Sequence, residues 1–411
     1  MMGEEQTGMQ FHVTVSRDTN VEKAGRAVGN AVKEAFGESP VDLAFVFFST
    51  HYAEDAQRLV KAIRHEVPIQ VLLGCMGEGV IGDSEEFEGP AVVTLWAARL
   101  PKVHVFPMHL TFREEGNSYV MQGWPEGVAS STERPTFILL ADPFSTPIEE
   151  LFSRIDQQCP GAPAIGGVAS GGADLGENRL VLNDEVFHTG IVGVVVWGAI
   201  SIRTVVSQGC KPIGDRYVVT KAERNIIYEL GGAPTLERLQ TILQGLGADE
   251  ARQAAMALQV GVAFDEHRER LDRGDFLIRG LLGADQQSGG VAVSDLVKEG
   301  QTVQFHVRDA QSASEELNLL LAKDRVDFPK EVPKGALLFS CNGRGRRFFA
   351  EPHHDISTVQ KRAGSIPVAG FFAAGEIGPV GGQNFIHGYT ASVALFSEPT
   401  EASPSHQPHS S

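Results

Sequence analysis

One pattern occurs three times along the chain: an apolar strand, a helix, a proline, a second apolar strand, a glycine-rich turn and a further apolar strand. The copies begin near residues 42, 136 and 335. Their apolar runs are short and rich in β-branched and aromatic residues, which is typical of buried strands. The strand–helix–strand order predicts right-handed crossovers. We therefore expect an α/β fold with mixed sheets built from repeated β-α-β-β units.

The glycine-rich turns fall at the matching place in each copy, beyond the end of the second strand. They read GCMGEGVIG at 74–82, GGVASGG at 166–172 and AGEIG at 374–378. Glycine allows positive φ and lets another backbone or a ligand approach closely, and open α/β sheets bind ligands at such rims. Tight turning alone would explain one of these segments, whereas three at equivalent places favour a shared pocket.

The repeats and the composition together suggest a domain organisation. The 411 residues, 42% hydrophobic and 21% charged, suit a globular protein of two or three domains. We expect a strand and a helix within 1–40, a domain of two repeats at 41–207, a related domain at 208–397 and a disordered tail at 398–411. Because both domains carry the same kind of layer, we expect a helix-sheet-sheet-helix arrangement.

Charge, cysteine content and missing motifs narrow the class of protein. The net charge of −17 argues against nucleic acid and anionic membranes as partners. The four cysteines lie far apart without a CxxC motif, which predicts reduced thiols and a cytoplasmic protein. The longest apolar run, at 190–202, is too short to span a bilayer. With no HExxH motif, EF-hand loop, Walker A motif or dinucleotide-binding βαβ motif, we expect neither a metal nor a cofactor.

The three glycine-rich segments, together with FSCNGRG at 339–345 and IHGYTASVALF at 386–396, resemble the FIST family, in which a FIST N domain is paired with a FIST C domain. The resemblance extends from about residue 40 to 396, so we expect a stand-alone member of the family. It implies a sensory, ligand-binding module with small molecules such as amino acids as proposed ligands. Met76 stands where the family commonly has Ser or Thr, and Gly388 follows His387 where Asn is common. If those groups contact ligand in relatives, we expect a different ligand here.

Arg344 and Glu376 are the first candidates for ligand contact. A guanidinium at a strand end binds a carboxylate or phosphate in a bidentate manner, and a buried carboxylate requires a cation or several N–H donors. An amino acid carries both charges and suits this pair, although a salt bridge within the protein or a solvated turn would also explain Glu376, and balancing the acidic surface would also explain Arg344. The full set of candidate ligand-binding residues is Arg344, Glu376, His387, Gly343, Gly345, Gly375, Cys341, Cys75 and Glu78.

These observations favour a sensory protein inside the cell that binds an amino acid, or a similar small zwitterion or anion, and signals through a protein partner. Two alternatives stay open. An enzyme acting on a small metabolite would use Cys341 as nucleophile with His387 and Glu376, although a buried cysteine is usually an inert small hydrophobe. A ligand-free adaptor or scaffold is the other alternative.

Overall fold

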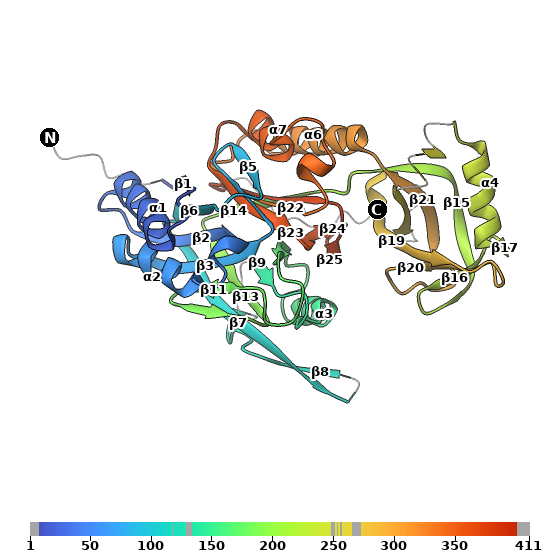
Figure 1. Cartoon of the computed structure of the whole chain (residues 1–411), viewed down its shortest axis with the longest axis horizontal. Helices are drawn as coiled ribbons and strands as arrows, with labels where there is room; N and C mark the ends of the chain where they lie inside the picture. The colour runs from blue at the N-terminus through green and yellow to red at the C-terminus, as the bar shows by residue number, and fades with distance from the viewer. Residues whose placement is uncertain are drawn as a thin grey trace.

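The computed structural model describes residues 8–400 except 117, 129–133, 248–250, 253, 255, 256 and 265–272. It contains three matching α/β units that form a body, and a separate β-barrel that is inserted into the third unit (Figure 1). The expected α/β fold with mixed sheets and repeated units is confirmed. Residues 401–411 of the expected tail lie outside the described residues. Within the described part of the chain, every helix is too short or too polar to cross a membrane.

The first unit starts with an edge strand and a capped helix. Asn20 accepts a hydrogen bond from the backbone N of Lys23 (3.0 Å) and so caps α1. The second helix buries the apolar stripe that its spacing predicts, Ala56, Leu59 and Ile63. The elements of this unit are β1 (Gln10–Ser16), α1 (Val21–Phe36), β2 (Val41–Ser49), η1 (Thr50–Tyr52), α2 (Ala56–Glu66), β3 (Ile69–Gly77), β4 (Gly79–Gly82), β5 (Glu85–Glu88) and β6 (Val93–Arg99).

The third unit follows this order, and so does the second in its strands and α-helices, except that strand β8 stands where the first unit has helix α1. The second consists of β7 (Val103–Glu115), β8 (Ser118–Gln122), β9 (Thr136–Ala141), α3 (Ile148–Gln158), β10 (Ala164–Val168), β11 (Leu180–Leu182), β12 (Glu185–Phe187) and β13 (Ile191–Gly198). The third consists of β14 (Ser201–Ser207), α6 (Ala310–Asp327), β22 (Gly335–Cys341), η4 (Gly345–Arg347), α7 (His354–Ala363), β23 (Val368–Ala373), β24 (Gly375–Val380), β25 (Gln383–His387) and β26 (Ala391–Ser397).

The barrel interrupts the third unit between β14 and α6. The first part of β15 pairs with β21 and its last part pairs with β16, so a ring of six strands closes. Helix α4 packs Leu239 and Ile242 into an apolar barrel core. The barrel elements are β15 (Cys210–Glu223), β16 (Ile226–Leu230), β17 (Ala233–Pro234), α4 (Thr235–Gly245), β18 (Leu258–Ala263), β19 (Phe276–Ala284), β20 (Val291–Val293) and β21 (Thr302–Arg308).

Each unit gives the hairpin that follows its second parallel strand to the sheet of another unit. Hairpin β4–β5 of the first unit pairs with β23 of the third, β24–β25 of the third pairs with β10 of the second, and β11–β12 of the second pairs with β3 of the first. The exchange is therefore cyclic, and it crosses the domain boundary expected at 207/208. Strand β14, at the end of the expected first domain, also pairs with β26 near the end of the chain.

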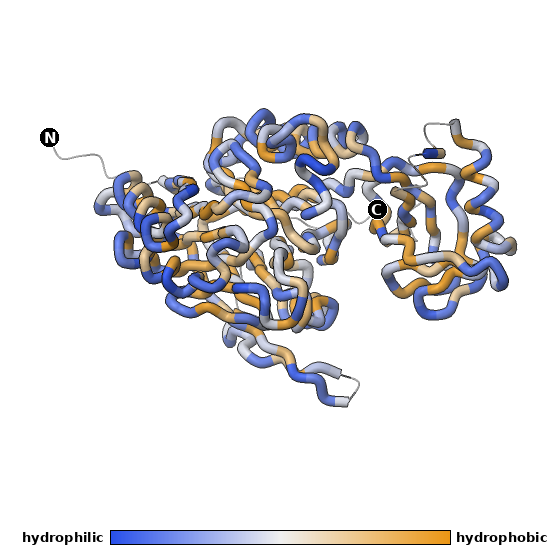
Figure 2. Tube along the Cα trace, in the orientation of Figure 1, coloured by the Kyte–Doolittle hydropathy of each residue, from blue (hydrophilic) through white to orange (hydrophobic). Residues whose placement is uncertain are grey.

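The helices lie outside the sheets, and the largest apolar core lies between the sheets. Phe47, Phe339 and Phe371 come from three different strands and their rings pack together in that core. Separate apolar layers lie under α1 and α2, under α3, and under α6 and α7. Figure 2 shows the apolar stretches following the strands in the interior, while the outer faces of the helices are hydrophilic. This is the layering expected when each sheet and helix buries one face.

The two parallel strands of each unit approach each other closely at one glycine. Val46 lies opposite Gly74, Leu139 opposite Gly166, and Leu338 opposite Gly370. A Cβ atom would lie 2.1 Å from the carbonyl oxygen of Val46 if added to Gly74, 1.8 Å from that of Leu139 if added to Gly166 and 1.7 Å from that of Leu338 if added to Gly370. Because the nearest atom at each glycine is a backbone carbonyl oxygen of the neighbouring strand, no side chain can be accommodated at these positions.

We expect Gly370→Ala to lower the free energy of unfolding by roughly 3 kcal/mol, because the new methyl group must push β22 and β23 apart. Urea unfolding followed by circular dichroism measures this. Gly283→Ala is the matched control, since a Cβ there meets no atom within 4 Å. Its effect should stay within about 0.5 kcal/mol. Equal effects of the two substitutions would contradict the close-approach argument.

Candidate functional site

A cavity of about 490 Å³ lies where the parallel strands of all three units end. Two sets of three equivalent residues line it. Thr50, Pro143 and Asn342 each stand four positions after the residue opposite the close-approach glycine, and Glu78, Ser170 and Ala374 each stand four positions after that glycine itself. The cavity therefore lies on the approximate threefold axis of the body, at the carboxyl ends of the strands, where α/β sheets bind ligands.

Hydrogen bonds between the units form the floor of this cavity. The backbone N of Ser170 donates to the Met76 carbonyl (3.4 Å), and that of Ala374 donates to the Val168 carbonyl (3.0 Å). The third link of this kind passes through a side chain, because the backbone N of Glu78 donates to Ser170 Oγ (2.8 Å). Ser170 Oγ in turn donates to the Phe372 carbonyl. The three units are thus joined directly at this cavity.

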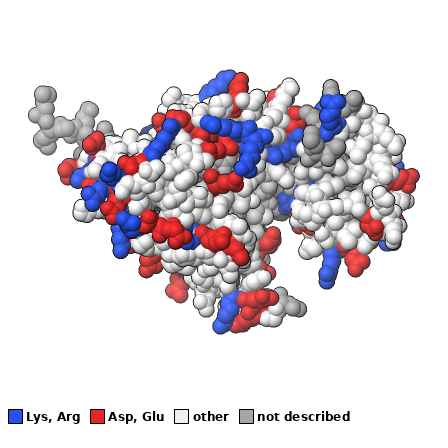
Figure 3. Space-filling model, viewed as in Figure 1, with Lys and Arg blue, Asp and Glu red and all other residues white. Residues whose placement is uncertain are grey.

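Glu78 is the acidic residue of the cavity lining. Its Oε2 accepts a hydrogen bond from Asn342 Nδ2 (3.3 Å), and its Oε1 accepts one from Arg347 Nη2 (3.0 Å). The two charged side chains remain 41% and 70% exposed, so their attraction is screened by water and is worth little. Phe144 and Ala169 add apolar surface to the same cavity. On the face seen in Figure 3, acidic and basic side chains adjoin in the same intermixed way.

Arg344 is fully buried and already has an anionic partner. Its Nε and Nη2 donate to the two carboxylate oxygens of Asp355 (2.7 and 2.8 Å), which is a bidentate pair. Burial opposes ionisation of Asp355, but the Arg344 guanidinium outweighs it and holds the pKa of that carboxyl well below its usual range. Glu86 of the exchanged hairpin accepts the backbone N–H groups of Asp355 and Ile356 at the start of α7. Arg344 therefore fastens β22 to α7 and does not line the cavity.

Glu376 is buried at a position that is apolar in the other two units. The sheet registers place it one residue beyond the close-approach glycine of its neighbour, as they place Val80 and Leu180. Its Oε2 accepts hydrogen bonds from the N and Oγ1 of Thr390 (3.0 and 2.7 Å), while Oε1 has no hydrogen-bond partner among the described residues. Burial raises the pKa of Glu376 to about 8. Like Arg344, it lies outside the cavity lining.

His387 and Cys341 are buried near Glu376. His387 is the cross-strand partner of Glu376 in the β24–β25 hairpin, and its Nε2 lies 3.0 Å from the Gly378 carbonyl. Burial lowers the pKa of His387 to about 4. Burial and the nearby Glu376 carboxyl raise the pKa of the Cys341 thiol to about 12. A thiol that resists ionisation is a weak nucleophile, so this geometry gives the enzyme alternative little support.

The remaining predicted residues serve packing and turns. Cys75 is fully buried in the central core, and burial raises its pKa well above the ordinary value. Gly375 pairs with Val168 in the exchanged sheet. Gly345 has a φ of +66° and begins the single turn η4, and the Gly343 carbonyl accepts a hydrogen bond from Arg308 of the barrel. Among the described residues, no group of three or more His, Cys, Asp or Glu side chains is placed to hold a metal ion.

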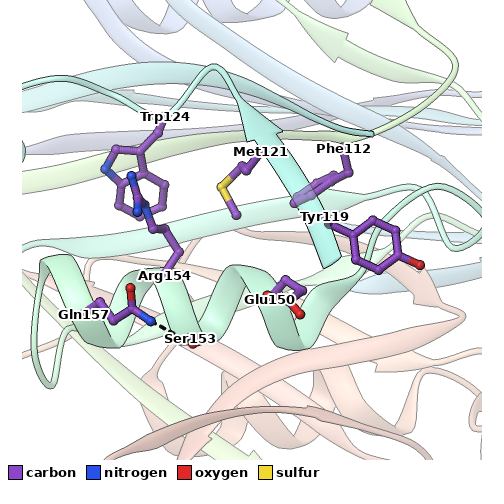
Figure 4. Close-up of a pocket in the computed structure, with 8 residues that line it drawn as sticks. All are labelled: Phe112, Tyr119, Met121, Trp124, Glu150, Ser153, Arg154 and Gln157. Atoms are coloured by element: carbon purple, nitrogen blue, oxygen red, sulfur yellow. Dashed lines mark hydrogen bonds between the residues drawn. The ribbon is translucent and has the colours of Figure 1, made fainter. Parts of the chain in front are cut away.

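A second cavity, of about 220 Å³, lies between helix α3 and the projecting β7–β8 arm (Figure 4). Phe112 and Met121 are cross-strand partners on its arm side, and the Arg154 guanidinium lies 5.7 Å from the Trp124 ring. Tyr119 is 45% exposed at the open end. All of its lining residues belong to the second unit, whereas every unit contributes to the central cavity. The central cavity is therefore the stronger candidate.

The sequence pointed to one cavity residue, Glu78, and missed the others. Thr50, Ser170 and Asn342 are common polar residues, and only their equal spacing from the strand glycines distinguishes them. That spacing becomes visible once the three glycines are aligned by strand register. The family resemblance covers Arg344 within 339–345 and does not extend to Arg347, which is the arginine that contacts Glu78.

Protonation of Glu376 makes stability depend on pH in a defined direction. Its pKa rises from 4.5 to about 8 on folding, so this group favours the fold below pH 4.5 and that stabilisation is lost as the pH rises to about 8. Glu376→Gln removes the titrating group. We expect the variant to gain stability relative to the wild type over this range, by up to about 1 kcal/mol per pH unit, measured by urea unfolding at each pH. Glu85→Gln, at an exposed ion pair with Arg17, is the control, and parallel profiles for all three proteins would contradict the prediction.

Family models match most of the chain: the FIST N domain at residues 42–233 and the FIST C domain at 235–379. The chain is also similar to an uncharacterized protein of Mycobacterium tuberculosis, with 42% identity over 389 residues that cover 94% of this chain and 100% of the relative. An uncharacterized protein of Mycobacterium bovis is 40% identical over 378 residues, or 92% of this chain and 96% of the relative. FIST domains are in general sensory, small-ligand-binding domains of signal transduction. The chain belongs to the FIST family.

Proposed function

We propose that this protein senses a small zwitterion, such as an amino acid, that binds in the central cavity. The ligand's ammonium group contacts Glu78 and its carboxylate contacts Arg347, so that the ligand takes the place of their mutual ion pair. The observation that carries the proposal is the position of this exposed pair beside a cavity to which every unit contributes. The cavity volume lies within the usual range of small-molecule sites.

The energetic argument depends on the low cost of separating Glu78 from Arg347. An ion pair that is half exposed contributes little to stability, so a ligand that supplies one charge to each partner loses little by separating them. A guanidinium also offers two parallel N–H groups to a carboxylate. Asn342 and the Thr50 hydroxyl add hydrogen-bonding groups, and Phe144, Ala169 and Ala374 offer a surface for an apolar side chain. This arrangement moves the predicted charge pair from Arg344 and Glu376 to Arg347 and Glu78.

Two wider statements belong to the same proposal. We propose a location inside the cell, because all four cysteines are buried free thiols and the chain is strongly acidic. We also propose that a protein partner receives the signal, as expected of a sensory module. The adaptor alternative predicts a partner without any ligand and is separated from the proposal by the binding experiments below.

A thermal-shift screen against the twenty common amino acids tests the proposal. At a ligand concentration 100-fold above Kd, binding adds about 2.7 kcal/mol and should raise the melting temperature by about 5–10 °C. We expect Glu78→Gln to abolish most of this shift, because the neutral amide cannot compensate an ammonium charge. Glu237→Gln, on the exposed face of α4, is the matched control and should keep the full shift. A flat screen with the wild-type protein would favour the adaptor alternative.

Filling the cavity without changing its charge provides a second test. Ala374 is exposed and lines the cavity, so Ala374→Leu should fold normally and still exclude the ligand. We expect at least a tenfold weaker affinity by isothermal titration calorimetry, which corresponds to about 1.4 kcal/mol. Ala374→Gly at the same position is the control and should bind as the wild type does. Unchanged affinity in Ala374→Leu would place the ligand elsewhere.

A further inference from the structure

The barrel is joined to the body by a narrow two-stranded stem. The chain enters the barrel through residues 208–209, between β14 and β15, and leaves it through Asp309, between β21 and α6. Cys210 and Arg308, the first and last barrel residues, are cross-strand partners, so the two crossings lie side by side. Asp309 caps α6 by accepting a hydrogen bond from the backbone N of Ser312 (2.7 Å). Figure 1 shows the barrel standing apart from the body at one end of the molecule.

Arg308 fastens this stem to the third unit. Its Nη2 donates to the Gly343 carbonyl (2.6 Å), and its guanidinium lies between the rings of Phe348 and Tyr389, 4.0 and 4.6 Å from their centroids. Burial lowers the pKa of Arg308 from its ordinary value, and the neighbouring Arg344 acts in the same direction. A cation held between two rings and one carbonyl depends on the position of the segment that supplies them. Two of these three groups come from residues 342–348, which we call the coupling segment.

The coupling segment also contributes to the ligand cavity. Asn342, at its start, lines the cavity and donates to Glu78 Oε2, and Arg347, near its end, donates to Glu78 Oε1. Glu78 thus contacts both ends of the segment, while Arg308 contacts its Gly343 carbonyl and its Phe348 ring. The segment is anchored between them by the buried Arg344–Asp355 pair and by Glu88, which accepts the backbone N of Arg346 (2.9 Å). The Glu78 contacts are exposed and weak, so breaking them costs little and lets the two ends of the segment shift while these anchors stay in place.

We propose that occupancy of the central cavity is transmitted through the coupling segment and Arg308 to the barrel, whose orientation relative to the body is the output signal. This inference rests on the function proposed above. A ligand that inserts between Glu78 and Arg347 breaks the direct contacts of Glu78 with Arg347 and Asn342. The displaced segment then carries Gly343 and Phe348 away from the positions that Arg308 requires. The two states differ in contacts at both sites, as coupling between distant sites requires. The barrel also contacts the body through the hydrogen bond from Arg279 Nη1 to the Ile386 carbonyl (3.3 Å) and through the Phe264 ring, which packs against Gly381.

Distance measurements by double electron–electron resonance on the full chain test this inference without a known ligand. Spin labels are attached at Lys361→Cys on α7 and Gln240→Cys on α4, both exposed, and the four native cysteines are buried. Glu78→Ala releases the coupling segment and should shift or broaden the body–barrel distance distribution. Arg308→Ala should also shift or broaden this distribution. The double variant Glu78→Ala/Arg308→Ala should give the same distribution as Arg308→Ala alone. Arg308→Lys, which keeps the charge but not the planar contact with the rings, serves if the alanine variant unfolds.

Controls and outcomes separate this inference from the proposed function. Glu85→Ala lies on the exchanged hairpin beside Arg17 and should leave the distances unchanged. A Glu78→Ala distribution equal to that of the wild type, or a Glu78→Ala effect that persists in full without Arg308, would overturn the transmission route. The mixture of twenty amino acids used in the thermal screen is then added to the labelled wild type. If the variants move the barrel and the amino acids do not, the proposed ligand class is wrong while the transmission route stands. If the amino acids give a thermal shift but the variants do not move the barrel, the ligand class stands and the transmission route is wrong.

Discussion

The body depends on a close contact between backbones that only glycine permits. At Gly74, Gly166 and Gly370 a methyl group would lie within about 2 Å of a carbonyl oxygen on the neighbouring parallel strand. These contacts fix the register of β2 on β3, β9 on β10 and β22 on β23, and the register decides which residues stand at the strand ends. The six equivalent cavity residues each stand four positions after one of these glycines or after the residue opposite it. A shift by one residue in any pair would point that unit's contribution away from the cavity.

Equivalent positions carry different chemistry in the three units, and this difference gives the central cavity its charged, polar and open sides. Glu78, Ser170 and Ala374 occupy the same place, yet one is charged, one donates a hydrogen bond within the floor and one leaves the site open. Val80, Leu180 and Glu376 likewise share one place, and only the third is polar. A symmetric fold thus encloses an asymmetric cavity. A buried acid costs stability. The third unit, which bears the barrel, therefore differs from the other two in having Glu376 at this buried position.

Local sequence patterns predicted the units but not how they assemble. Apolar runs, glycine turns and the helix stripe of Leu59 and Ile63 depend on neighbours along the chain, and the structure confirms them. The hairpin exchange depends on which sheet edge is nearest in space. The sequences of β4 and β24 do not indicate which strand each pairs with. The sequence does not reveal that Asp355, 11 positions after Arg344, is its partner, because Asp355 looks like an ordinary helix residue. Arg344 was therefore expected to bind a ligand. The sequence offers Glu78 or Val80 as the first unit's counterpart of Glu376, and the sheet registers show that the counterpart is Val80.

The cyclic hairpin exchange also affects how the chain is completed during synthesis on the ribosome. Hairpin β4–β5 is made early, but the strand that receives it, β23, emerges about 280 residues later. Strand β10 likewise waits for β24, with its edge unpaired until almost the whole body has been translated. An exposed edge in a half-made protein attracts other chains. The nascent chain therefore needs protection until its last unit arrives, and a gene shortened before β24 encodes a product with an open sheet.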